Sequence, residues 1–108
     1  MALHEMKFSF QAEGETVSIP KKWSHTGVVG SGDMEVLIRH KELKGKAEFK
    51  VVTPVTGFDN IWEKVLKKFV NDTKVGNVFV EINDNNSTPF IASMRLKQAL
   101  IEAQEGGE

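Results

Sequence analysis

The chain has 108 residues, a length typical of one small domain with a modest hydrophobic core. It carries 14 Lys and Arg against 15 Asp and Glu, and this balance gives no electrostatic basis for binding nucleic acid or an anionic membrane. The absence of cysteine excludes disulfides, thiolate metal sites and a cysteine nucleophile. The first ten residues lack the apolar core of a signal peptide, and no apolar run approaches the roughly 20 residues that span a bilayer. We therefore expect a cytoplasmic protein.

Alternating apolar residues predict strands in the first half of the chain. The first is short and contains Phe8 and Phe10. An irregular stretch follows, in which Pro20 blocks regular pairing, and residues 23–29 are expected to be extended. The segments "DMEVLIRH" and "AEFKVVTP" then alternate clearly, and each places three apolar residues on one face. These are Met34, Val36 and Ile38 in the first segment, and Ala47, Phe49 and Val51 in the second.

The second half predicts two helices with a strand between them. Residues 57–74 hold apolar residues at helical spacing, with Asp59 or Asn60 near the start and stop signals over residues 71–76. This apolar face comprises Phe58, Ile61, Trp62, Val65, Leu66, Phe69 and Val70. The strand "NVFVEI", with Val78, Val80 and Ile82 on one face, and the polar turn "NDNNS" follow. Thr88 and Pro89 then fit the start of a final helix, which has an apolar stripe of Leu96, Ala99, Leu100 and Ala103.

This order of elements predicts an α+β fold. We expect one domain over residues 1–108, a two-layer sandwich in which a mostly antiparallel sheet packs on two helices. The first few residues and residues 104–108 are expected to be flexible.

The segment "TGVVGSGD" raises the question of chemistry, because Ser31 lies between Gly30 and Gly32 and is followed by Asp33. A plain hairpin turn explains the glycines. A hydrolytic triad of Ser31, His25 and Asp33 has the right residue types, but the residues are close in sequence and a strand follows the serine in place of the helix of a nucleophile elbow. A phosphate-binding loop would need a helix after the glycines, and a metal site would need more ligands than Asp33 and Glu35, so we expect no metal.

Covalent modification of Ser31 is the chemical alternative. Flanking glycines remove steric cover and allow turns that are closed to other residues, so a modifying enzyme can approach the hydroxyl closely. Asp33 is then expected to help align that enzyme or its bound metal. The residues alone leave this reading open beside the plain turn.

The string "GVVGSGDMEVL" resembles the signature of the acyl carrier, or delta, subunits of malonate decarboxylase. The later "STPFIASMRL" resembles a second patch of the same family, here with Thr88, Pro89, Arg95 and Leu96. The resemblance covers about Phe8 to Ala103, with departures in the basic connection "RHKELKGKAEF" and before Thr26. A more distant similarity is to the gamma, or acyl carrier, subunit of citrate lyase, in which a serine is followed two residues later by aspartate.

The resemblance implies a non-catalytic carrier subunit with no catalytic residues of its own. It implies that phosphoribosyl-dephospho-coenzyme A is joined to Ser31 by a phosphodiester and carries acetyl and malonyl groups as thioesters, with Gly30, Gly32 and Asp33 around the attachment point. Such a group also supplies the thiol that a chain without cysteine lacks. The implied partners are the acetyl-CoA/malonate transferase subunit, the decarboxylase subunits, a prosthetic-group transferase and a malonyl transferase. The alternatives are a carrier for a citrate-type lyase, and an interaction module in which Ser31 only forms a turn.

Overall fold

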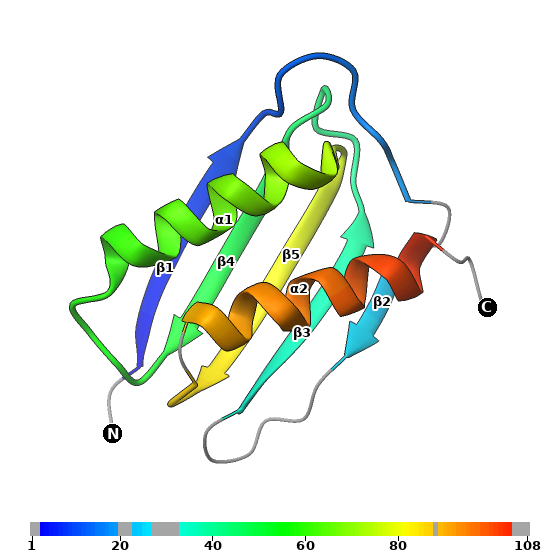
Figure 1. Ribbon diagram of the computed structural model, residues 1–108. Coiled ribbons are helices and arrows are strands. Elements are labelled where there is room, and N and C mark those ends of the chain that lie inside the picture. Colours follow the sequence, from blue (N-terminus) through cyan, green and yellow to red (C-terminus); the bar gives the residue numbers. More distant parts are fainter. Residues whose placement is uncertain (1–2, 20–22, 27–32, 88, 105–108) are drawn as a thin grey trace.

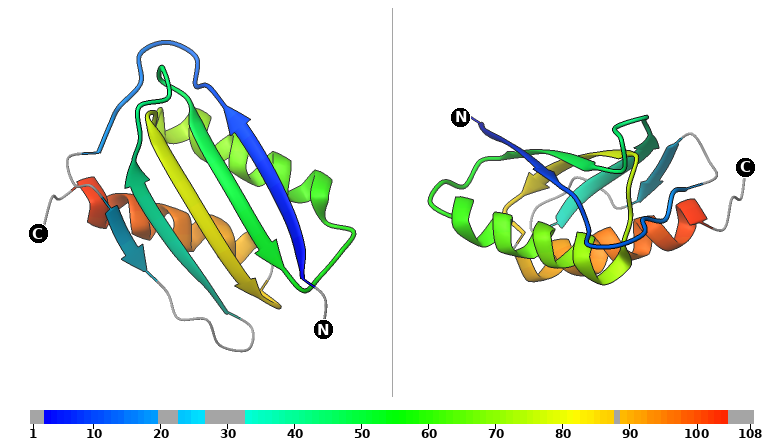
Figure 2. Two further views of the ribbon diagram at one scale, coloured as in Figure 1. Left: turned by 180° about the vertical axis from the view of Figure 1, so that it is seen from behind. Right: turned by 90° about the horizontal axis from the view of Figure 1, so that it is seen from above.

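The computed structural model describes residues 3–19, 23–26, 33–87 and 89–104. Five strands and two helices form two layers, with both helices on one face of the sheet (Figure 1). In chain order the elements are β1 (His4–Phe10), β2 (Trp23–Thr26), β3 (Asp33–His40), β4 (Ala47–Thr53), α1 (Asp59–Thr73), β5 (Val78–Asn85) and α2 (Pro89–Gln104). The other face of the sheet has no helix over it (Figure 2). The predicted α+β sandwich is therefore confirmed.

The sheet has the strand order β1-β4-β5-β3-β2 and is mixed, but mostly antiparallel. The parallel pair is β4 and β5, which α1 connects as a crossover, because two parallel neighbours cannot be joined by a tight turn. The order of the strands depends on this crossover, which inserts β5 between β4 and β3.

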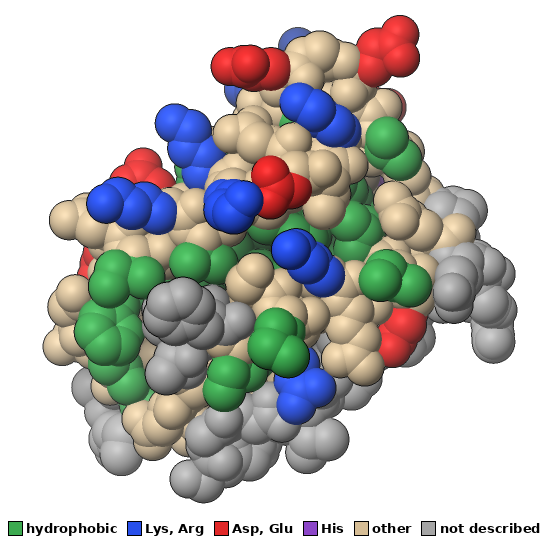
Figure 3. Space-filling model, in the orientation of Figure 1, with side chains coloured by type: hydrophobic (Ala, Val, Ile, Leu, Met, Phe, Trp, Pro, Cys, Tyr) green, Lys and Arg blue, Asp and Glu red, His purple; other side chains and the backbone are tan. Residues whose placement is uncertain are grey.

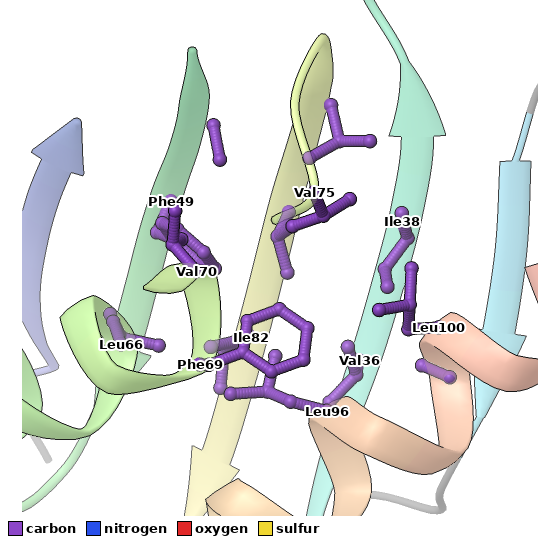
Figure 4. Close-up of a cluster of buried hydrophobic side chains, with 14 of the residues drawn as sticks. Val36, Ile38, Phe49, Leu66, Phe69, Val70, Val75, Ile82, Leu96 and Leu100 are labelled. Atoms are coloured by element: carbon purple, nitrogen blue, oxygen red, sulfur yellow. The ribbon is translucent and has the colours of Figure 1, made fainter. Parts of the chain in front are cut away.

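The core fills the space between the sheet and the helices (Figure 4). Every apolar residue predicted on the inner faces of β3, β4 and β5 is less than 2% exposed, because alternate side chains of a strand point to the same face. Trp62 and Phe69 of α1 are buried, as expected, and Phe69 meets Phe49 of β4 edge-on at 6.3 Å between ring centroids. The predicted stripe of α2 is also buried throughout.

The start of α1 differs from the sequence prediction. The N-cap is Phe58, without a side-chain hydrogen bond, and Phe58 and Ile61 are 37% and 46% exposed instead of packed in the core. Asp59 lies in the first turn and accepts a hydrogen bond from His4 Nε2 at 3.1 Å, which ties α1 to the start of β1. The helix ends with Lys74 in the left-handed conformation.

The stretch after β1 was expected to be irregular, and it is nevertheless tied to the fold. Ala12 and Ile19 are buried, and Val17 forms an isolated parallel bridge with Val75. The Val17 amide donates to the Lys74 carbonyl, and the Gly76 amide donates to the Val17 carbonyl at 2.9 Å. Gly76 is needed here because a Cβ atom on it would lie against the backbone of the turn between β3 and β4.

Candidate functional site

The candidate modification segment, residues 27–32, joins β2 to β3. Ser31, Gly30 and Gly32 lie outside the described residues, so their expected roles remain predictions. The chain on both sides is described, since β2 ends at Thr26 and β3 begins at Asp33. Both residues lie at the end of the sheet where β4 and β5 also finish and where α2 begins (Figure 1).

The first residues of β3 extend beyond β2 and, within the described part of the chain, pair with β5 alone. Thr26 is opposite Val36, whereas Asp33 is opposite Asn85 in the β3–β5 ladder. The Asn83 Nδ2 of β5 donates to Glu35 Oε1 at 3.0 Å. The chain is therefore held by β5 as soon as it leaves residues 27–32.

A buried polar cluster lies at the same end of the sheet. Asp84 Oδ2 accepts a hydrogen bond from the Thr53 hydroxyl at 2.7 Å, and Asp84 Oδ1 accepts from both the amide and the hydroxyl of Ser87. All three side chains are buried. This carboxylate therefore ties the end of β4 to the turn before α2, and in the ladder Asp84 is opposite Met34, near the start of β3.

The prediction of a polar turn over residues 83–87 was wrong in one respect. The strand β5 continues to Asn85, and Asp84 takes the next inward position after Val78, Val80 and Ile82. Sequence reasoning missed this cluster because an Asn- and Asp-rich segment is typical of a turn. The alternation that continues through Asp84 was the available signal.

The backbone register does not favour a hydrolytic triad. His25 is opposite Leu37, four residues along β3 from Asp33, and four residues of a strand span roughly 13 Å. Among the described residues, no group of three or more His, Asp or Glu is placed to hold a metal ion. The described part of the chain also contains no helix that is long and apolar enough to cross a membrane.

Both faces of the molecule carry paired charges, but the helix side also exposes hydrophobic side chains. On the open face of the sheet, Lys7 and Lys50 approach the Glu5 carboxylate at 3.8 and 3.9 Å, and Arg39 lies 4.9 Å from the Phe79 ring centroid. On the helix side, Lys68 pairs with Asp72 at 2.8 Å, and exposed hydrophobic side chains lie next to Lys and Arg (Figure 3). The predicted stripe of α2 did not include Met94 and Ile101, and both are exposed in the structure, but the sequence pattern assigned them no role.

Comparisons with known proteins agree with this fold. The family described as "Malonate decarboxylase delta subunit (MdcD)" matches residues 21–103. The chain is 54% identical to the malonate decarboxylase acyl carrier protein of Malonomonas rubra, covering 94% of this chain and 90% of the relative. It is 33% identical to that of Stenotrophomonas maltophilia, covering 92% and 93% of the two chains.

A solved structure has the same fold. In the crystal structure of a Pseudomonas malonate decarboxylase hetero-tetramer in complex with malonate, one chain superposes with a TM-score of 0.79. The two chains are 28% identical, and the match covers 93% of this chain and 98% of the other.

Proposed function

The chain belongs to the family of malonate decarboxylase acyl carrier proteins, or delta subunits, and on this premise we propose that Ser31 carries the covalent prosthetic group. The observation that carries the proposal is the position of Ser31 in the "GVVGSGD" string, on a connection whose two ends are held in the sheet. We propose that the group is phosphoribosyl-dephospho-coenzyme A, attached through a phosphodiester. When attached, it supplies the thiol that holds acetyl and malonyl groups.

The sequence around Ser31 suits such an attachment. Only a hydroxyl is needed from the chain, and the glycines at positions 30 and 32 carry no side chains that would hinder a modifying enzyme. The hydrogen bond between Asn83 and Glu35 holds the start of β3, at which residues 27–32 end. The Asp84 cluster lies at the same end of the sheet. A rigid base with a tethered group raises the effective concentration of the acyl group at each partner site.

The chain's own part in the reaction is to bind and present. We propose that it has no catalytic residue and that it assembles with transferase and decarboxylase subunits, which act on the tethered acyl group in turn. Separate enzymes, a prosthetic-group transferase and a malonyl transferase, would load it. The family match favours malonate over a citrate-like acid.

Reconstitution of the complex tests this role. With Ser31→Ala, carbon dioxide release from malonate should fall to the level without carrier, while the circular dichroism spectrum and melting temperature stay those of the parent. Ser18→Ala is the matched control, because Ser18 is exposed on the loop after β1, and it should leave the rate unchanged. A normal rate with Ser31→Ala would overturn the assignment.

A further inference from the structure

Two large apolar side chains lie on the outer face of α2, where a surface helix normally exposes polar residues. Met94 and Ile101 are 71% and 55% exposed, and their spacing of seven residues places them on the same side of the helix. Lys97 and Gln98 lie between them and are also exposed. A surface helix usually buries one apolar stripe and presents charged or polar residues to water. Here the inner stripe is complete, so Met94 and Ile101 do not serve the core.

The neighbouring helix provides an internal comparison. After its first turn, α1 exposes only charged and amide side chains, namely Glu63, Lys64, Lys67, Lys68, Asn71 and Asp72. Both helices lie side by side on the same sheet and face the same solvent (Figure 1). On α1 the exposed apolar residues, Phe58 and Ile61, are confined to the start of the helix, whereas on α2 they continue to Ile101, near its end.

The charge next to this surface is positive. Lys97 makes no ion pair within the described part of the chain, and it lies close enough to Asp72 of α1 to act on that carboxylate together with Lys68 and Lys74. Only one of these cations, Lys68, is within ion-pair distance of Asp72, at 2.8 Å. A partner that covers α2 would therefore gain from carboxylates placed around its apolar centre.

The position of α2 connects this surface to the proposed carrier site. α2 packs against β2 and β3, the two strands that bound residues 27–32. A protein bound to the outside of α2 would thus be attached to the helix that packs against both strands next to residues 27–32. Methionine also suits a surface that must fit more than one partner, because its side chain is flexible and polarizable.

We propose that Met94, Lys97, Gln98 and Ile101 form a docking surface, the α2 outer surface, for another subunit of the decarboxylase complex. This surface would enter an apolar groove of the partner with carboxylates at the rim of the groove, and residues four and seven apart on α2 would be its anchors. This inference rests on the proposed function, since it assumes that the chain works within a complex.

Binding of the chain, made without its prosthetic group, to the purified remaining subunits of its own complex tests the proposal by calorimetry. Met94→Glu and Ile101→Glu should each weaken binding about tenfold or more, because each places a charge in the apolar centre of the interface. Lys97→Glu should weaken it severalfold and reverse the effect of added salt. Ile61→Glu is the matched control, because Ile61 is 46% exposed on α1, and it should leave the affinity unchanged. Unchanged melting temperatures would show that all four variants fold.

The outcomes separate the docking proposal from the carrier proposal. Ser31→Ala should bind normally, because docking requires no prosthetic group. Unchanged affinity in both Met94→Glu and Ile101→Glu, or an equal loss of affinity with Ile61→Glu, would overturn the docking proposal. The proposal that Ser31 carries the prosthetic group would not be affected. If the isolated chain forms a dimer that Met94→Glu abolishes, the occupant is a second copy and the proposed partner is wrong. If the parent binds no other subunit, the docking proposal fails, and carbon dioxide release with Ser31→Ala still tests the carrier proposal.

Discussion

Removing the carboxylate of Asp84 should destabilise the whole domain. In Asp84→Ala, the Thr53 hydroxyl and the Ser87 amide lose an acceptor at 2.7 and 3.1 Å, and both residues are buried. Each buried donor left without an acceptor costs roughly 1–3 kcal/mol of stability. Part of this loss is offset, because the variant no longer has to desolvate a buried carboxylate on folding. We expect the free energy of unfolding to fall by about 2–4 kcal/mol, a large share of the roughly 5–15 kcal/mol typical of a domain.

Urea denaturation followed by tryptophan fluorescence measures this loss, since Trp62 is 1% exposed. Asp84→Asn retains an acceptor oxygen and should lose less than Asp84→Ala. Glu63→Ala, an exposed acid on α1, is the control and should stay within about 0.5 kcal/mol of the parent. If Asp84→Ala also stays within about 0.5 kcal/mol, the cluster does not hold the end of the sheet together and the reasoning is refuted.

Two further substitutions test other parts of the fold. Gly76→Ala should lower the free energy of unfolding by about 1–3 kcal/mol in the same urea assay, because the new Cβ would lie 2.9 Å from Thr16 Cβ and against the Gly45 backbone; an unchanged midpoint would contradict this. The hydrogen bond from Lys68 holds the pKa of Asp72 below its ordinary value, so this pair stabilises the fold above about pH 4 and the contribution is lost as the pH falls further. In Lys68→Ala, NMR titration should find the Asp72 pKa raised, and the stability difference from the parent should shrink towards pH 2; an unmoved pKa would show that Lys68 is not its cause.

Local patterns in the sequence predicted most of the fold. Strict alternation identified the inner residues of β3, β4 and β5, because a half-buried strand has no other way to cover its core face. Helical spacing identified the buried side of both helices. The order of the strands could not be predicted, since it depends on how α1 crosses from β4 to β5 and inserts β5 beside β3.

Long-range contacts explain the remaining differences. Phe58 and Ile61 continue the apolar spacing of α1, but both remain exposed in the fold, whereas Trp62 beside them is buried. Asp59 lies in the first turn of α1, as expected, and it also contacts His4, 55 residues away in the sequence. Asp84 was assigned to a turn because Asn- and Asp-rich segments are typical of turns, and its buried partner Thr53, 31 residues away, becomes a neighbour only in the folded sheet.

Less of the candidate site than of the fold could be predicted from the residues alone. The glycines around Ser31 indicated an accessible hydroxyl, and only the similarity to the carrier family indicated which group it holds. The exposure of Met94 and Ile101 agrees with the predicted stripe of α2, which did not include them. The sequence did not indicate that they form a docking surface, because that proposal also depends on the packing of α2 against β2 and β3.

The most direct test of the central claim is the intact mass of the chain, produced together with the prosthetic-group synthesis and attachment enzymes of its own source. The account predicts an added mass equal to one phosphoribosyl-dephospho-coenzyme A in phosphodiester linkage, located by fragmentation of the tryptic peptide spanning residues 23–39. This peptide contains Ser24 as well as Ser31, so it also tests the position. The adduct should be on Ser31 and absent from Ser31→Ala. No added mass, when the same enzymes load a known carrier, or an adduct on Ser24, would contradict the account.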